Sequence, residues 1–152
     1  MPLLETVHAS CVLIGEHGIL IRGPAGSGKS TLARTLVTDA GRIGRYAAHV
    51  ADDRTRLEAR NGRLVGRPVP AIAGKLEIRG AGLLSVSHEP AAVIHLVLDL
   101  SAEPPPRFPE DAQGATVLCG IAIRRLLLQS GTPCSDLIQA WARNRDLTSM
   151  TV

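Results

Sequence analysis

The sequence predicts an α/β fold whose sheet is mixed or largely antiparallel rather than doubly wound. Short apolar runs alternate with turn signals, as in CVLIGEHGILIR at 11–22 and in the hairpin expected at Asn61-Gly62. Helical spacing occurs in only two segments, one after residue 28 and one near the C-terminus. Many hairpins with few helices do not match a repeated strand-helix-strand pattern. At 152 residues, a single domain over 1–152 is expected.

The expected elements follow from local patterns along the chain. Turn residues separate the strands, and a cap or a glycine bounds each helix. In chain order they are two strands around a turn at 16–18, a glycine loop at 23–30, a helix to about Thr38 stopped by Gly41, a strand near 46–51, the hairpin at Asn61-Gly62, a short element, glycine break and strand at 76–86, a buried strand at 92–99, a four-proline loop at 101–114, and a helix at 132–145 capped by Thr132.

Composition and charge exclude several classes of protein. The net charge is +3, but the basic residues are scattered and the chain has three aromatic residues, too few for base stacking on nucleic acid. The apolar run at 91–100 is interrupted by His95 and Asp99 and is too short to span a membrane. The N-terminus lacks the pattern of a secretory signal, so a cytoplasmic location is expected. Three widely spaced cysteines favour neither disulfides nor zinc.

The segment GPAGSGKS satisfies the phosphate-binding pattern G-x-x-x-x-G-K-[ST] in full. It runs from Gly23 to Ser30, follows the apolar strand GILIR and precedes the helical segment STLARTLV. Glycines let backbone N–H groups approach phosphate oxygens at a helix N-terminus, the lysine reaches the terminal phosphates, and the serine hydroxyl binds magnesium. The flanking strand and helix make a chance glycine-rich turn a poor explanation. The loop is therefore expected to hold a nucleotide together with Mg²⁺, and the family resemblance described below implies that the nucleotide is ATP.

A phosphate-binding loop of this kind needs a carboxylate for the metal or for the attacking group, and two places offer one. The strand AAHVADD ends in Asp52 and Asp53, where one carboxylate could act as a base while the other orients it or binds metal. Capping of a turn is the alternative explanation for this pair. Asp99, at the end of VIHLVLDL, is the weaker candidate because a single carboxylate before a loop is more often a turn residue.

Four segments together resemble the catalytic domain of HPr kinase/phosphorylase. They are His8, the glycine loop at 23–30, ADDR at 51–54 and LEIRGAGLL at 76–84, and the resemblance covers about residues 7–110. Members of that family use ATP to phosphorylate a serine of the small phosphocarrier protein HPr and can remove the phosphate by phosphorolysis. The resemblance implies a fold similar to the HPr kinase and phosphoenolpyruvate carboxykinase-like fold, with HPr as the protein partner.

The resemblance also implies roles for residues at matching positions. It assigns catalytic roles to His8, Lys29, Asp52, Asp53 and Arg107, with Asp53 as the general base, Asp52 in support and Arg107 on a mobile loop. Ser30 and Glu77 are the implied magnesium ligands. The implied ATP-binding residues are Gly23, Pro24, Ala25, Gly26, Ser27, Gly28, Lys29, Ser30 and Thr31.

The chain also departs from the family's longer members. It begins almost at the catalytic domain, as in short forms similar to those of alphaproteobacteria, and Thr31 stands where many members have glutamate. GIAIRRLLL only faintly matches the segment tied to phosphorolysis, so kinase activity is better supported. Family resemblance implies a hexamer.

Two other functions remain open at this level. A P-loop kinase for a small molecule would transfer phosphate without a protein acceptor, and its lid would be rich in arginines, whereas Arg107 alone occupies the long loop. A nucleotide-sensing module would bind ATP without transfer. The Asp52-Asp53 pair is the feature that argues against a sensor.

Overall fold

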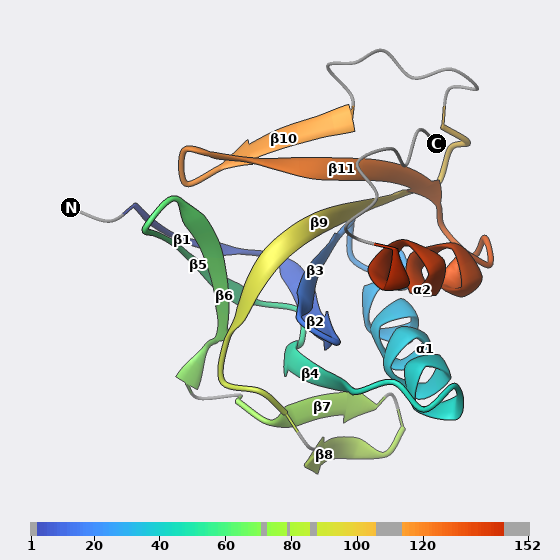
Figure 1. Ribbon diagram of the computed structural model, residues 1–152. Coiled ribbons are helices and arrows are strands. Elements are labelled where there is room, and N and C mark those ends of the chain that lie inside the picture. The colour runs from blue at the N-terminus through green and yellow to red at the C-terminus, as the bar shows by residue number, and fades with distance from the viewer. Residues whose placement is uncertain (1–2, 71–72, 79, 86–87, 106–113, 145–152) are drawn as a thin grey trace.

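The computed structural model describes residues 3–70, 73–78, 80–85, 88–105 and 114–144 (Figure 1). These residues form a sheet with two helices at one side of it, and a small separate hairpin. The elements are β1 (Leu4–Val7), β2 (Ala9–Ile14), β3 (His17–Arg22), α1 (Lys29–Arg42), β4 (Ala47–Ala51), β5 (Thr55–Arg60), β6 (Arg63–Pro68), β7 (Lys75–Ile78), β8 (Gly82–Ser85), β9 (Ala92–Ser101), β10 (Ala115–Leu118), β11 (Ile121–Gln129) and α2 (Ser135–Arg143).

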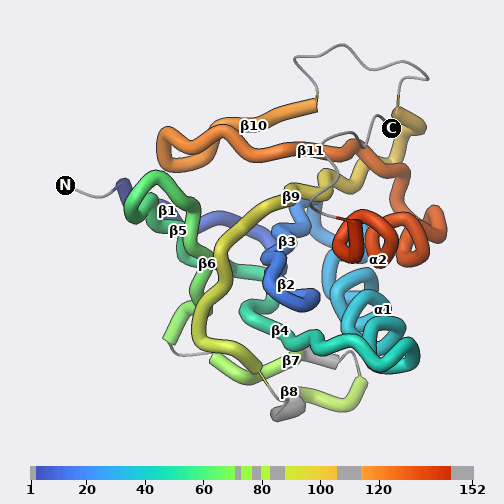
Figure 2. Tube along the Cα trace, viewed as in Figure 1, coloured from blue at the N-terminus to red at the C-terminus, as the bar shows by residue number. Residues whose placement is uncertain are grey.

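The large sheet is mixed, which confirms the predicted fold class. Its strand order is β1-β5-β6-β9-β3-β2-β4, and β11 carries β10 along the other part of β9. Only the β3–β9 and β9–β11 pairs are parallel; the other described pairs are antiparallel. β6 pairs with the start of β9 at Val93, and β11 pairs with β9 from Leu96 onward. The sheet therefore forks along one edge of β9, as the tube view makes visible (Figure 2).

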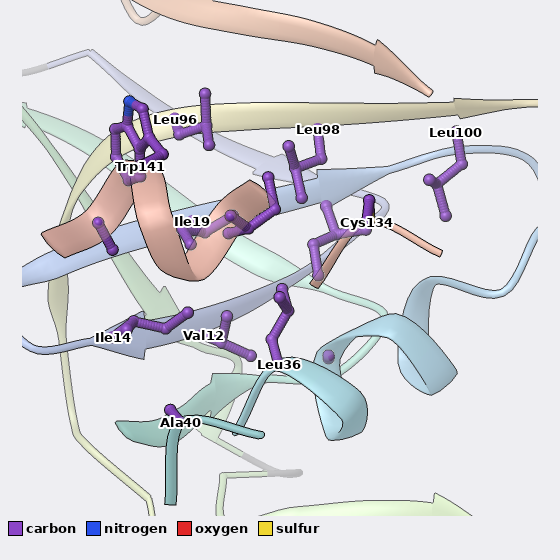
Figure 3. Close-up of a cluster of buried hydrophobic side chains, with 14 residues drawn as sticks. Val12, Ile14, Ile19, Leu36, Ala40, Leu96, Leu98, Leu100, Cys134 and Trp141 are labelled. Atoms are coloured by element: carbon purple, nitrogen blue, oxygen red, sulfur yellow. The ribbon is translucent and has the colours of Figure 1, made fainter. Parts of the chain in front are cut away.

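Apolar side chains fill both sides of the central strands. In β2, Val12 and Ile14 belong to a cluster with the helices, whereas Ala9 and Cys11 belong to a second cluster with β5 and β6. Alternation along an extended strand sends successive side chains to opposite faces, so a strand with both faces covered is apolar throughout. Figure 3 shows the first cluster, in which Leu36 of α1 and Trp141 of α2 meet side chains of β2, β3 and β9.

Helix α1 begins where predicted but ends later. The prediction that Gly41 stops the helix is wrong, because Gly41 lies inside α1 and the helix continues to Arg42. The left-handed backbone that often follows a helix occurs at Gly44, with φ 74°. Arg45 N–H then donates to the Ala40 carbonyl at 2.8 Å, which satisfies one of the last helical acceptors.

Helix α2 is shorter than the sequence suggested. It starts at Ser135 with Cys134 at the cap position, so the predicted capping role of Thr132 is wrong. The buried Gln139 amide donates to the Leu36 carbonyl of α1 at 2.9 Å, and Arg45 donates to the Gln139 carbonyl at 3.0 Å. These bonds fix α2 against α1.

Three strands were not expected from the sequence. β1 is an edge strand with three of its four residues exposed, so it has no apolar alternation. β10 and β11 form a hairpin through Cys119, which has φ 50°, and Gly120, which has φ 77°. Within the described ranges no helix is long and apolar enough to cross a membrane.

Candidate active site

Three segments of the predicted site meet at one end of the sheet. β2 is antiparallel to both β3 and β4, with Ala9 opposite Arg22 and Cys11 opposite Ala51. The residues just before β2 therefore lie beside those that follow β3 and β4. This register brings His8, the glycine loop and the Asp52-Asp53 pair together.

The glycine loop is closed around its own lysine. Lys29 is 5% exposed, and its Nζ donates to the carbonyls of Gly23 at 2.9 Å and Pro24 at 3.2 Å. A Cβ at Gly23 would lie 2.5 Å from Ser27 Oγ and 3.1 Å from the Leu100 carbonyl oxygen, so the loop needs glycine there. Gly28 caps α1 with φ 97°, a left-handed conformation that turns the chain into the helix. The loop thus directs the N-terminus of α1 and a lysine toward one point, an arrangement suited to phosphate.

The carboxylate of Asp52 accepts hydrogen bonds from two hydroxyl groups. Ser30 Oγ donates to its Oδ1 at 2.6 Å, and Ser10 Oγ donates to the same atom at 3.2 Å. The first of these hydrogen bonds places Asp52 next to the serine that the glycine-loop pattern assigns to magnesium. Burial also lowers the pKa of the neighbouring His49, and the negative charge of Asp52 only partly offsets that effect.

Asp53 lies between a histidine and the loop lysine. Its Oδ1 is 2.9 Å from His8 Nε2 and 4.0 Å from Lys29 Nζ, and its side chain is 56% exposed. The residue has φ 65°, a left-handed conformation that aspartate tolerates better than most residues. Asp53 is therefore a solvent-accessible carboxylate held beside the lysine of the glycine loop.

Ser10 joins the two aspartates and was not identified from the sequence. It is fully buried in β2, donates to Asp52 and accepts a 3.1 Å hydrogen bond from the Asp53 N–H. The available signal was a hydroxyl residue between Ala9 and Cys11 in a strand that is otherwise apolar. A buried hydroxyl group needs hydrogen-bond partners, and the partners of Ser10 are Asp52 and Asp53.

Two predicted site residues are described only in part or not at all. Glu77 lies in β7, and its side chain is outside the part of the chain that the structure describes. The adjacent Leu76 lines a small cavity with His49 and Asp52, so β7 runs beside the end of β4. Arg107 lies outside the described residues.

Among the predicted ATP-binding residues, Pro24, Ala25 and Gly26 are exposed along the outer side of the loop. Thr31, the last of them, is exposed in the first turn of α1. Its hydroxyl accepts from Arg34 at 3.5 Å, and its carbonyl accepts from the Thr35 hydroxyl at 3.0 Å. This exposed stretch leaves the loop accessible to a ligand.

Asp99 is held by two arginines within the sheet and does not start a turn as the sequence suggested. It lies within β9, not at a turn, and its carboxylate accepts from Arg22 Nε at 2.7 Å and from Arg22 Nη2 at 2.8 Å, and also from Arg125. Burial raises the pKa of Asp99, but the hydrogen bonds from the two arginines outweigh it and hold the pKa below its ordinary value of 3.8. These hydrogen bonds connect β3, the strand before the glycine loop, to β9 and β11.

We expect Asp99→Asn to destabilise the fold by about 1–2 kcal/mol at pH 7, since two partly buried guanidinium groups lose their anion. Because the folded pKa lies below the unfolded one, this stabilisation is present above about pH 4 and is lost as the pH falls through the folded pKa. Urea unfolding at pH 7 and near pH 3 measures the difference. Glu16→Gln, an exposed carboxylate in the β2–β3 turn, is the control. A difference that persists undiminished at the lower pH would contradict the ion-pair explanation.

Comparison with known proteins identifies the family of this chain. Residues 3–152 match the family described as HPr Serine kinase C-terminal domain. HPr kinase/phosphorylase of Streptococcus thermophilus is 40% identical over 82 residues, 53% of this chain, and that of Shouchella clausii is 41% identical over 84 residues, 55% of this chain. In both cases the match spans 25% of the relative's length.

A solved structure shares the fold over nearly the whole chain. The Hpr(Ser) kinase/phosphatase from Coxiella burnetii superposes with a TM-score of 0.71 at 27% identity, covering 94% of this chain and 91% of that one. The fold of this chain is therefore shared with a protein named Hpr(Ser) kinase/phosphatase. The chain belongs to the HPr Serine kinase C-terminal domain family.

Proposed function

We propose that this protein is an ATP-dependent serine kinase that phosphorylates the phosphocarrier protein HPr. The observation that carries the proposal is the position of Asp53, whose carboxylate lies 4.0 Å from the ammonium group of Lys29 and 2.9 Å from His8. A base for a seryl hydroxyl has to lie next to the phosphate that is transferred. The names of the relatives supply the substrate, because they are HPr kinases.

The proposed reaction is a direct transfer. Asp53 accepts the proton of the seryl hydroxyl while the seryl oxygen bonds to the γ-phosphorus of ATP and the bond to the β-phosphate oxygen breaks, releasing ADP. Lys29 neutralises charge on the phosphate oxygens, and His8 holds the Asp53 carboxylate in position. In phosphorolysis, Asp53 would return the proton to the leaving serine.

We further propose a magnesium ion as the cofactor. Ser30 and Glu77 are the ligands that the resemblance implies, and we add Asp52 because its carboxylate accepts a hydrogen bond from Ser30. The fit rests on donor chemistry, since Ser30 Oγ and Asp52 Oδ1 are 2.6 Å apart and Mg²⁺ prefers oxygen ligands from one or two carboxylates together with substrate phosphates. When bound, the ion would neutralise charge on the β- and γ-phosphates. Ser10 would keep Asp52 oriented toward it.

The test is phosphate transfer in a purified system. The chain is incubated with ATP, Mg²⁺ and HPr from the same organism, and HPr is analysed by mass spectrometry for one added phosphate on a serine. HPr with that serine replaced by alanine is the control, and only the natural HPr should be modified.

The other outcomes separate the competing functions. Consumption of ATP with a small-molecule acceptor and no modification of HPr would support a small-molecule kinase instead. Binding of ATP with no transfer to any acceptor would support a nucleotide sensor. Either result would overturn the proposal.

A further inference from the structure

The strand pairing is interrupted at the place where the candidate site lies. The ladder of β1 with β5 ends where Val7 lies opposite Thr55, and the ladder of β2 with β4 begins where Cys11 lies opposite Ala51. Three residues of each segment lie between these two pairs, so the register is the same on both sides of the gap. This gap contains the histidine and both aspartates of the candidate site.

Side-chain hydroxyl groups bond to backbone groups inside the gap. Thr55 Oγ1 donates to the Ala9 carbonyl at 2.8 Å, and the Asp53 N–H donates to Ser10 Oγ at 3.1 Å. Ser10 and Thr55 are both fully buried. Backbone groups that leave a ladder need another partner, and the two hydroxyl groups supply one. They thus let the strands separate here without leaving these backbone groups unpaired.

The single proton of the Ser10 hydroxyl has one place to go. A backbone N–H can only donate, so Ser10 must accept from Asp53. Its own proton is then left for Asp52 Oδ1, at 3.2 Å. One buried side chain therefore contacts the backbone of one aspartate and the carboxylate of the other.

Asp53 depends on this contact more than Asp52 does. Asp52 Oδ1 also accepts from Ser30 at 2.6 Å, so it keeps a donor without Ser10. Asp53 has φ 65°, a left-handed conformation that persists where the surroundings constrain it. The described constraints on Asp53 are the bond from its N–H to Ser10 and the contact of its carboxylate with His8. Loss of the Ser10 hydroxyl would release the first of these.

We propose that Ser10 is a positioning residue for phosphate transfer, which acts by holding the backbone of Asp53 so that its carboxylate stays beside Lys29. The inference rests on the proposed function, and it assigns part of the rate to a buried side chain that does not itself reach a substrate. Misplacement of a reacting group by about 1 Å can cost about a hundredfold in rate. The contribution of Ser10 is therefore expected in kcat and not in the affinity for ATP.

The first test compares the two buried hydroxyl groups of the gap. Ser10→Ala removes the bonds to both aspartates, whereas Thr55→Val removes the bond to the Ala9 carbonyl. Ser10→Ala is expected to lower kcat for phosphorylation of HPr about thirtyfold and to leave the dissociation constant for ATP within about twofold. Thr55→Val, and Ser10→Thr with its retained hydroxyl group, should both keep kcat within about threefold. An unchanged kcat in Ser10→Ala, or an equal loss in Thr55→Val, would contradict the proposal.

A double-mutant cycle distinguishes positioning of the base from a general loss of structure. If Ser10 acts through Asp53, adding Ser10→Ala to Asp53→Asn should slow a single turnover by less than about threefold, because the base is already absent. A loss as large in the Asp53→Asn background as in the unsubstituted protein would show that Ser10 acts elsewhere, and would overturn the proposal.

Hydrogen exchange at the Asp53 amide tests the contact without ATP or HPr. NMR should show exchange at least about tenfold faster in Ser10→Ala than in the unsubstituted protein, and little change in Ser10→Thr and Thr55→Val. Equal exchange in Ser10→Ala and the unsubstituted protein would contradict the proposal. An unsubstituted protein that never phosphorylates HPr would overturn the proposed function, while the exchange rates would still decide whether Ser10 holds Asp53.

Discussion

Asp53→Asn is expected to slow phosphorylation of HPr about a thousandfold while leaving the affinity for ATP within about twofold, since general-base catalysis contributes about 10²–10⁴-fold. Asparagine keeps the size of the side chain and its distance to Lys29 but cannot accept the seryl proton. Rapid-quench measurement of a single turnover gives the rate, and titration with ATP gives the affinity. Retention of the full single-turnover rate would exclude Asp53 as the base.

Asp52→Asn is the matched comparison, because the two residues are adjacent and share Ser10 as a partner. If Asp52 binds the magnesium ion, this substitution should raise the concentration of Mg²⁺ needed for half-maximal rate, and excess Mg²⁺ should restore much of the activity. Excess Mg²⁺ should not restore Asp53→Asn. The opposite pattern would exchange the roles of the two aspartates.

Lys29→Met is expected to lower kcat/KM for ATP about 10²–10³-fold and to weaken binding of ATP and of inorganic tripolyphosphate together. Methionine preserves the apolar stem but removes the ammonium group that donates to the Gly23 and Pro24 carbonyls. Both the charge at the phosphate site and the closure of the loop depend on that group. Steady-state kinetics and calorimetry with the two ligands measure the effects.

Both ligands should bind more weakly to Lys29→Met, because both carry phosphates. Urea unfolding of Lys29→Met shows whether the loss is local to the site. Binding of tripolyphosphate at full affinity by this variant would contradict the role of Lys29 in holding phosphate.

Much of the fold was predictable because local chemistry dominates it. Turn residues marked two hairpins, and the one at Asn61-Gly62 forms as expected between β5 and β6. The hairpin between β2 and β3 also forms, but its turn lies at Gly15 and Glu16 and not at 16–18, because His17 and Gly18 already pair within β3. The glycine loop between β3 and α1 also forms where its pattern indicated. In each case residues close in sequence decide the conformation, so a single sequence carries the signal.

The errors occurred where distant contacts decide the structure. β1 is largely exposed and joins the sheet by pairing with β5, so its own residues carry no periodic pattern. β11 is recruited by parallel pairing with β9, which no local spacing reveals. Gly41 stays helical because the left-handed turn falls at Gly44 instead. Tertiary context overrides local preference in all three.

The roles of the site residues have different standing. The structure brings His8, Lys29, Ser30, Asp52 and Asp53 together, and their catalytic roles stay predictions. The roles of Glu77 and Arg107, the magnesium ion, the single-domain organisation and the hexamer also stay predictions.

The sequence by itself determined a glycine loop that fits the phosphate-binding pattern, since Gly23, Gly28, Lys29 and Ser30 lie in one short segment whose local backbone geometry sets the loop. It also supplied the Asp52-Asp53 pair as a candidate. Only the tertiary structure decided which atoms meet there: antiparallel pairing of β2 with β3 and β4 puts Asp53 next to His8 and Lys29, and Asp52 next to Ser10 and Ser30. The tertiary structure likewise decided the packing of α2 against α1, which includes the hydrogen bond from Gln139 to the Leu36 carbonyl, between residues 103 positions apart in the chain.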